Sequence, residues 1–214
     1  MTIDRNVVPV VKQERAQVTV AMLLEATIDA LGEHGESGVR LDDILDTTGV
    51  SRSSLYHHFG DRDGLIDAAR VVVFARDVDA DIREIDRVLD RATTAREFRE
   101  GLERVTAATQ SPARRAKRMQ RAYTIGASQA RPELATALAT EQERLTDRIA
   151  TIVLGAQAKG WLRRDLDPRA VAVLVQAYTL GRVVSDIDAN PVTPAGWDGL
   201  INVVSEALMA PDAD

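Results

Sequence analysis

Cysteine does not occur among the 214 residues of the chain. Disulfide bonds, thiol nucleophiles and metal sites built from thiolates are therefore excluded. Long apolar runs are missing as well, since none approaches the roughly 20 residues that a bilayer-spanning helix needs. The segment 1–15 carries charged residues around only a short apolar patch, which is not the pattern of a signal peptide. We therefore expect a cytoplasmic protein with no membrane partner.

Positive charge is in short supply. Lysine occurs only at Lys12, Lys117 and Lys159, so arginine would have to hold any bound phosphate group. The formal net charge is −6, from 27 Lys and Arg against 33 Asp and Glu. This balance argues against broad, nonspecific attraction to nucleic acid or to an anionic membrane. Any DNA binding would have to come from a small, local set of groups.

Alternating patterns typical of β-strands are lacking, and each long segment has a helical period instead. Val20, Leu24, Ile28 and Leu31 recur on one helical face, and the three glycines of residues 32–38 are expected to end that helix. We predict an all-α fold, with three short helices in an N-terminal helix-turn-helix domain (1–65) and a C-terminal helical bundle (66–214). The further helices are expected over 41–46, 52–59, from 62 or 63 onward, 94–109, 112–129, 132–160, 167–186 and 194–209.

Motifs typical of catalytic and cofactor sites are also absent. The sequence has no G-x-S-x-G nucleophile elbow and no glycine-rich phosphate loop. His57 and His58 are adjacent, so on a helix their side chains diverge and cannot readily share a metal ion. Asp77, Asp79 and Asp81 form an acidic cluster that we interpret as a solvated face. We therefore predict no enzyme activity, no catalytic residue, no metal site and no cofactor.

The stretch TTGVSRSSLYHHFGDRDGL, residues 47–65, has the outline of a helix-turn-helix motif. Gly49 can adopt the positive φ that a tight turn requires, and Ser51 can cap a helix that begins at residue 52. Val50, Leu55 and Phe59 would attach this second helix to the domain core. The opposite side of the helix would then face outward, in the position from which such motifs reach base edges.

Polar groups of different reach are concentrated on and beside that second helix. Arg52 could bind guanine O6 and N7, while Ser53 and Ser54 could donate to or accept from a base or a water. Tyr56, His58 and Arg62 suit phosphate contacts, although Tyr56 and His58 could instead pack beneath the bundle. The candidate DNA-binding residues are Arg40, Ser51, Arg52, Ser53, Ser54, Tyr56, His57, His58 and Arg62.

Two stretches, LLEATIDALGEHG and VRLDDILDTTGVSRSSLYHHFGDRDGLIDA, resemble the N-terminal domain of the TetR (tetracycline-repressor-like) family of bacterial transcriptional regulators. The resemblance covers residues 15–70, and beyond them only the helical architecture is similar. It implies a homodimer that binds a palindromic operator in double-stranded DNA, usually as a repressor. It also implies an unknown small-molecule effector whose binding to the C-terminal domain shifts the two DNA-binding domains apart. The family residues are Asp43-Ile44, Gly49-Val50-Ser51, Leu55-Tyr56-His57-His58-Phe59 and Arg62.

The sequence departs from the family pattern at several positions. Arg40 stands where the family usually has a capping threonine, so a weaker helix cap and an added phosphate contact are expected. Leu45 and Thr48 replace common alanines, which predicts slightly different packing under the turn. Residues 1–70 carry seven basic and twelve acidic side chains, a net charge of −5. We expect Arg40, Arg52 and Arg62 to face DNA and most carboxylates to lie behind them; the alternative is a helical ligand-binding or scaffold protein that has lost DNA binding.

The last two helices carry surplus apolar surface. The segment 170–181 is apolar nearly all round, so it must be covered on more than one side. A second subunit would supply that cover, although both helices could instead form the buried centre of a monomer. The candidate dimer-interface residues are Val173, Ala177, Leu180, Val184, Trp197, Leu200, Ile201, Val204 and Leu208.

The sequence gives fewer indications of where an effector would bind. Aromatic side chains and methionine are common in small-molecule cavities, although each could be an ordinary core residue. Arg114, Arg118 and Arg121 share one helical face, which we interpret as solvated; an anion-recognising patch is the alternative. The candidate pocket residues are Phe74, Phe98, Leu102, Met119, Tyr123 and Tyr178.

Overall fold

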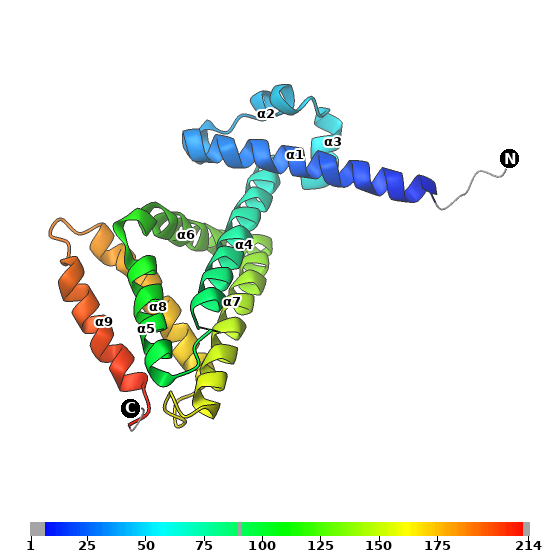
Figure 1. Ribbon diagram of the computed structural model, residues 1–214. Coiled ribbons are helices and arrows are strands. Elements are labelled where there is room, and N and C mark those ends of the chain that lie inside the picture. Colours follow the sequence, from blue (N-terminus) through cyan, green and yellow to red (C-terminus); the bar gives the residue numbers. More distant parts are fainter. Residues whose placement is uncertain (1–6, 90, 212–214) are drawn as a thin grey trace. The chain divides into compact units, whose positions relative to one another are not determined.

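The computed structural model describes residues 7–89 and 91–211, and these form helices together with one isolated bridge between Leu162 and Met209. The all-α prediction is confirmed (Figure 1). The α-helices are α1 (Val7–Gly38), α2 (Leu41–Thr48), α3 (Arg52–Phe59), α4 (Arg62–Leu89), α5 (Ala95–Gln110), α6 (Arg115–Ala127), α7 (Pro132–Ala158), α8 (Pro168–Asp186) and α9 (Pro194–Leu208). Two short 3-10 helices, η1 (Pro112–Arg114) and η2 (Ser128–Ala130), flank α6. Residues 1–6, part of the segment judged for a signal peptide, lie outside the described residues.

The chain divides into two compact units, residues 1–75 and 76–214. The division falls inside α4, so this one helix contributes its first half to the N-terminal unit and the remainder to the C-terminal unit. The boundary that we expect at 65/66 lies near the beginning of the same helix. As a division between a DNA-binding and a ligand-binding domain, it stays a prediction.

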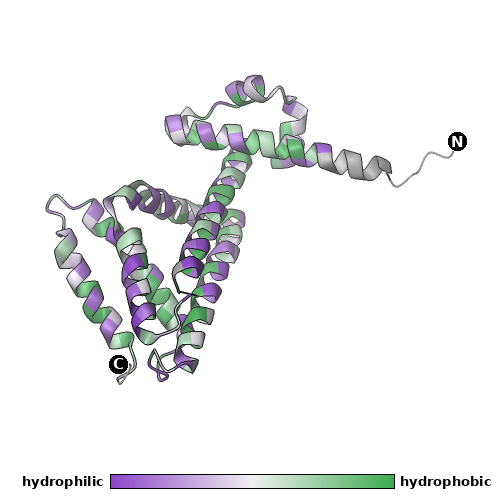
Figure 2. Cartoon of the chain, viewed as in Figure 1, coloured by the Kyte–Doolittle hydropathy of each residue, from purple (hydrophilic) through white to green (hydrophobic). Residues whose placement is uncertain are grey.

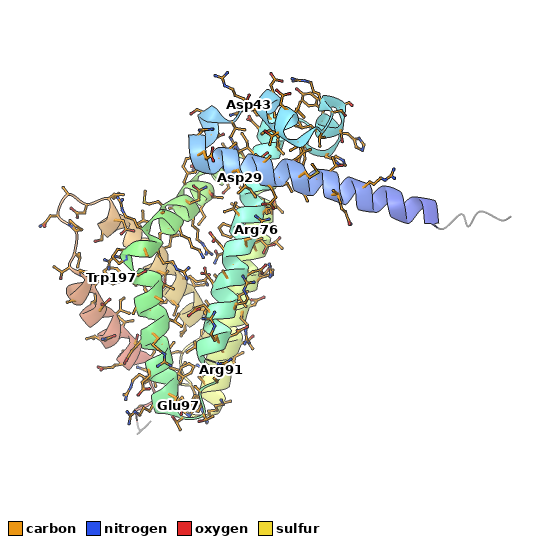
Figure 3. The ribbon with its side chains drawn as sticks, turned by 45° about the horizontal axis from the view of Figure 1, so that its top comes forward. Asp29, Asp43, Arg76, Arg91, Glu97 and Trp197 are labelled. Atoms are coloured by element: carbon orange, nitrogen blue, oxygen red, sulfur yellow. The ribbon has the colours of Figure 1, made fainter. Side chains whose placement is uncertain are left out.

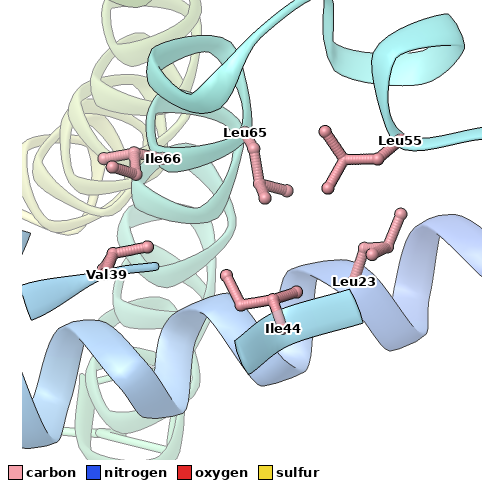
Figure 4. Close-up of a cluster of buried hydrophobic side chains, with 6 residues drawn as sticks. All are labelled: Leu23, Val39, Ile44, Leu55, Leu65 and Ile66. Atoms are coloured by element: carbon pink, nitrogen blue, oxygen red, sulfur yellow. The ribbon is translucent and has the colours of Figure 1, made fainter. Parts of the chain in front are cut away.

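The N-terminal unit is built around a small aliphatic core (Figure 4). Its members come from α1, α2, α3, the first half of α4 and the segment joining α1 to α2, so the core fixes these elements together. Full burial of an aliphatic side chain contributes roughly 1.5–3 kcal/mol, so each of these residues adds substantially to the unit's stability. The buried residues are Leu23, Val39, Ile44, Leu55, Leu65 and Ile66.

The first helix is longer than we predicted. It continues from Val7 to Gly38, a span of 32 residues, and only Gly35 leaves the helical conformation, with φ 66° and ψ 179°. Gly32, which we expected to help end this helix, keeps the helical conformation and lies within it. The expectation of three short N-terminal helices is therefore wrong for α1. For α3 the predicted bounds 52–59 are those of the structure.

Ion pairs join α4 to α6 and α7 in the C-terminal unit. Asp81 on α4 accepts from Lys117 at 2.9 Å and from Arg121 at 3.2 Å on α6, while Asp79 pairs with Arg144 on α7 at 2.6 Å. Asp77 also lies 3.2 Å from Lys117. The prediction that the acidic cluster is a solvated face is wrong, because the basic side of α6 and Arg144 of α7 lie against it.

The basic segment of α6 is likewise not a solvated face. Arg118 is buried and donates to both carboxylate oxygens of Asp186 at the end of α8, at 2.8 and 3.0 Å. The Nη1 atom of Arg118 donates to the carbonyls of Thr109 and Ser111 at the end of α5, each at 3.0 Å. One guanidinium group therefore connects α5, α6 and α8.

Side-chain caps begin α8 and α9, at Asp167 and Thr193. Asp167 accepts from the N–H of Ala170 at 2.7 Å, and Pro168 opens α8. Before α8, residues 159–167 form a loop in which Trp161 packs on Phe98, with ring centroids 5.7 Å apart. Hydropathy colouring shows apolar residues distributed along the last helix, α9 (Figure 2). No helix within the described residues is both long and apolar enough to cross a membrane.

Candidate nucleic-acid interface

The helix-turn-helix geometry is built by a glycine turn between α2 and α3. Gly49 has φ 67° and ψ 11°, the left-handed conformation, and its N–H donates to the carbonyl of Leu45 at 2.8 Å. The hydroxyl of Thr48 donates to Ile44 O at 2.8 Å and accepts from the N–H of Val50 at 3.4 Å. These bonds close the end of α2 and set the direction in which α3 leaves. The predicted turn at Gly49 is confirmed.

Ser51 caps α3 as the sequence predicts. Its hydroxyl accepts from the N–H of Ser54 at 3.3 Å and lies 3.1 Å from the hydroxyl of Ser53. The cap satisfies one of the N–H groups that the first turn of a helix leaves without an intrahelical partner. Ser51 therefore starts α3 at Arg52 and is partly committed to the backbone.

The exposed side of α3 presents polar groups to solvent. Leu55 is 0% exposed, whereas Tyr56, the next residue, is 42% exposed, so the helix has a clear inner and outer side. Ser54 and His58 are half-buried beside that outer side. The interpretation that Tyr56 packs beneath the bundle does not fit this exposure. We call the exposed set the recognition face of α3, and it consists of Arg52, Ser53, Tyr56 and His57.

Arg52 is paired within the protein. Its guanidinium donates to the carboxylate of Asp42 in the first turn of α2. The Tyr56 hydroxyl and then Asp42 raise the pKa of Arg52, because both interact favourably with its charge. Asp42 is therefore a carboxylate that lies beside Arg52 rather than behind it, and the expectation that most carboxylates lie behind the arginines stays a prediction. The sequence holds no local signal for this pair, since the partners are ten residues apart on different helices.

Arg40 and Arg62 have different surroundings. Arg40 is exposed at the start of α2, makes no side-chain cap and forms no ion pair with any other described residue, which matches the weaker cap expected there. The Arg62 Nε atom donates to the carbonyl of Val39 at 3.0 Å, and a second guanidinium nitrogen donates to Glu36 O. Arg62 therefore satisfies carbonyls at the end of α1. Its phosphate contact stays a prediction.

Histidine and carboxylate groups do not gather into a metal site within residues 7–89 and 91–211. The rings of His57 and His58 lie with centroids 5.2 Å apart at an interplanar angle of 64°. This edge-to-face arrangement follows from their neighbouring positions on α3.

The candidate dimer residues separate into two groups. On α8, Val173, Ala177 and Val184 are exposed and Leu180 is half-buried; Val184 is 70% exposed. The predicted stripe on α9 divides, because Ile201 is buried and Leu200 is exposed. Trp197, Val204 and Leu208 are half-buried. Val203, which is not among the candidate residues, is 62% exposed one turn after Leu200.

The candidate pocket residues are divided between the two units. Phe74 is buried in the N-terminal unit, whereas the other five belong to the C-terminal unit. Phe98 packs on Trp161, and Tyr178 shares a hydrogen bond of 3.0 Å with Thr106. Burial raises the pKa of the Tyr178 hydroxyl. The half-buried Leu102 and the exposed side chains of Met119 and Tyr123 complete the set.

Comparison with known proteins gives one family and a set of similar folds. Residues 23–69 match the model of the "Bacterial regulatory proteins, tetR family". The fold resembles that of a TetR-family transcriptional regulator from Cytophaga hutchinsonii, with a TM-score of 0.65, 16% identity and coverage of 91% of this chain and 96% of that one. A TetR-family regulator from Agrobacterium tumefaciens gives a TM-score of 0.60, 18% identity and coverage of 91% and 100%.

A third structure with this fold contains a ligand. A protein from Saccharomonospora viridis, solved in complex with choline, gives a TM-score of 0.64 at 18% identity, covering 90% of this chain and 98% of that one. Comparison with the sequences of curated proteins gives no significant match. The family model covers the helix-turn-helix, and the solved structures extend the similarity in fold through the C-terminal unit.

Proposed function

We propose that this chain is a homodimeric repressor that a small-molecule effector releases from its operator. Its N-terminal domain matches the TetR family, whose members are DNA-binding transcriptional regulators. Regulators of this family are transcription factors rather than enzymes. In the proposal, residues 1–65 bind one half of a palindromic operator, and residues 66–214 bind the effector and the second subunit. Such a regulator acts where the DNA is, so its expected location is the cytoplasm.

The observation that carries the proposal is the recognition face of α3. Leu55 holds the helix to the core, while Arg52, Ser53, Tyr56 and His57 remain at the surface. A guanidinium group, hydroxyls and an imidazole are the groups that read base edges and hold phosphates. Their position on the second helix of a helix-turn-helix supports insertion of that helix in the major groove.

Exposed apolar residues support the proposed dimer. Val173, Ala177 and Val184 follow one face of α8 at helical spacing, and Leu200 and Val203 lie on the outer side of α9. Large apolar side chains at the surface cost free energy in water, and a second subunit would remove them from it. A symmetric dimer would also present two copies of α3, as a palindromic operator requires.

An effector can act only through differential affinity. A ligand that binds one arrangement of the C-terminal unit more tightly shifts the dimer toward that arrangement, and DNA affinity changes by the same coupling free energy. The choline complex of the Saccharomonospora viridis protein supports a small-molecule site in a chain of this fold.

The test is binding to the double-stranded DNA that flanks the protein's own gene. Wild-type protein should bind a discrete palindromic site, and the double variant Arg52→Ala, Tyr56→Ala should lose that selectivity, since one bidentate arginine contact alone contributes about 1–3 kcal/mol. Arg96→Ala is the matched control, because Arg96 is exposed on α5 and, among the described residues, its ion pair is with Glu100 on the same helix. Its operator binding should equal that of the wild type.

A second function is favoured by the acidic N-terminal region. Residues 1–70 carry a net charge of −5, and Asp42 occupies Arg52. A helical ligand-binding or scaffold protein that has lost specific DNA recognition would have these features. Absence of selective binding by the wild type, with no effect of the double variant, would support this function against the repressor.

A further inference from the structure

Three side chains of the C-terminal unit carry polar atoms that are buried without a hydrogen-bond partner among residues 7–89 and 91–211. Gln110 on α5 is 4% exposed, and neither its Oε1 nor its Nε2 atom is bonded. Arg182 on α8 is 7% exposed, and its Nε atom has no partner. The indole Nε1 atom of Trp197 on α9 is also buried and has no hydrogen-bond partner among the described residues. Most buried polar groups in proteins are bonded, so such a group calls for an explanation.

Hydrogen bonds between α5, α6 and α8 place Gln110 and Arg182 at the same level of the bundle. Thr106 on α5 bonds Tyr178 on α8, and Gln110 and Arg182 each follow four residues later on the same face of their helix. The Arg118 guanidinium binds the carbonyls on either side of Gln110 together with Asp186, which lies one turn beyond Arg182. The helices α5 and α8 therefore run parallel to each other. Gln110 and Arg182 lie one helical turn beyond the hydrogen bond between Thr106 and Tyr178.

Trp197 brings the third helix to this group. The Cζ atom of Arg182 lies 5.4 Å from the centroid of the Trp197 ring, a distance at which a guanidinium group is attracted to an aromatic face. Trp197 is labelled in Figure 3 on α9, in the same unit as α5. Contacts between α5 and both α8 and α9 support the grouping of Gln110, Arg182 and Trp197, which we call the Arg182 cluster.

Arg182 differs from the other buried arginines of the described chain. Arg70 pairs with Glu36, and Arg118 pairs with Asp186, but no carboxylate of the described residues lies within ion-pair distance of Arg182. Burial of a permanent positive charge is costly unless an anion compensates it. The Trp197 ring supplies only part of that compensation, because it offers a quadrupole and no negative charge.

We propose that the Arg182 cluster is the subsite that binds the carboxylate of an anionic small-molecule effector. A guanidinium group offers two parallel N–H donors that match a carboxylate, and the Trp197 N–H and the Gln110 Nε2 add further donors. The Gln110 Oε1 atom would accept from a donor elsewhere on the ligand. The assignment of this subsite rests on the proposed ligand-responsive function, and it specifies the ligand as a carboxylate. The positive charge of Arg182 disfavours a cation such as choline.

The experiment measures thermal unfolding and calorimetric binding of the full chain without DNA, with acetate, benzoate, neutral benzamide and choline as probes. Benzoate, and acetate more weakly, should raise the Tm saturably, since a ligand that binds only the folded state stabilises it. Benzamide and choline should leave the Tm unchanged. Failure of both carboxylates to raise the Tm, or an equal effect of benzamide, would overturn the proposal.

Variants separate a ligand subsite from a structural role. Arg182→Met should abolish the benzoate response while the ligand-free Tm stays equal or rises, because an uncompensated buried charge is removed. Gln110→Leu should weaken benzoate binding about tenfold, the loss of one hydrogen bond to a charged group. Arg163→Met, which changes an exposed arginine paired with Asp165, is the matched control and should keep the full response. A lower ligand-free Tm for Arg182→Met would assign Arg182 to the fold and reject the subsite.

The outcome is independent of DNA recognition. Selective benzoate binding by a protein that does not bind its flanking DNA would reject the repressor and keep the subsite. Selective operator binding by a protein that ignores both carboxylates would keep the repressor and reject the subsite.

Discussion

Asp42 controls how much positive charge the recognition face of α3 presents to DNA. It binds Arg52, the residue with the strongest potential for base recognition on that face. DNA must therefore compete with this carboxylate for the guanidinium group. Both partners are more than half exposed, so the pair contributes little to folding stability and its main effect falls on binding.

We expect Asp42→Asn to strengthen operator binding. Removal of one negative charge next to a phosphate-facing surface changes the interaction by about 1 kcal/mol in water, which is about fivefold in affinity for each subunit. The increase should shrink as salt concentration rises, because exposed charges are screened. Gel-shift titrations at several salt concentrations measure both quantities.

Asp43→Asn is the matched control for this variant. Asp43 lies in the same first turn of α2, and removal of its carboxylate leaves the Asp42–Arg52 pair intact. An equal gain in affinity from both variants would show that net charge alone matters and that Arg52 is not restrained by its partner.

At the scale of elements, the joint between α3 and α4 depends on a glycine. A Cβ atom on Gly64 would lie 2.1 Å from the backbone carbonyl oxygen of Phe59, which no side-chain movement can relieve. Asp61 adds a cap by accepting from the N–H of Gly64 at 2.8 Å. The close approach fixes the angle at which α4 leaves the recognition helix.

Gly64→Ala should destabilise the N-terminal unit by about 1–3 kcal/mol, the usual cost of forcing extra volume into a packed site. Urea unfolding followed by circular dichroism measures the change. The same substitution at Gly32, a helical position with nothing within 4 Å of the added atom, should instead stabilise by about 0.5–1 kcal/mol. If both substitutions changed the free energy of unfolding in the same direction, the steric explanation would be contradicted.

Local signals predicted the elements, whereas partners distant in sequence could not be predicted. Ser51 and Gly49 act within a few residues of their own position, so the cap and the turn could be predicted. The pair of Arg118 and Asp186 joins residues 68 apart, and nothing in a single sequence indicates it. For the same reason the interpretation of α6 as a solvated basic face failed.

The candidate sites follow the same division. The outward side of α3 was predicted because helical periodicity alone separates Leu55 from Arg52 and Tyr56. The pocket residues were chosen by side-chain type, and type carries no information on which helices meet. The paired state of Arg52 and the Arg182 cluster both depend on contacts between helices, and so they emerge only from the fold.

At the scale of the whole molecule, operator binding should depend on the exposed apolar residues of α9. A palindromic site is bound with full affinity only when two copies of α3 are held together. Val203 is exposed, so a charge placed there leaves the folded monomer intact but opposes burial against a second subunit.

We expect Val203→Glu to shift the protein from dimer to monomer in sedimentation equilibrium and to abolish cooperative operator binding, with the Tm of the monomer little changed. Asn202→Glu is the control, since it places the same charge on the neighbouring exposed position of α9 and replaces a polar side chain. A Val203→Glu protein that stays dimeric would move the interface away from this face of α9. The exposed face of α8 at Val173, Ala177 and Val184 would then be the next surface to test for contact between two copies.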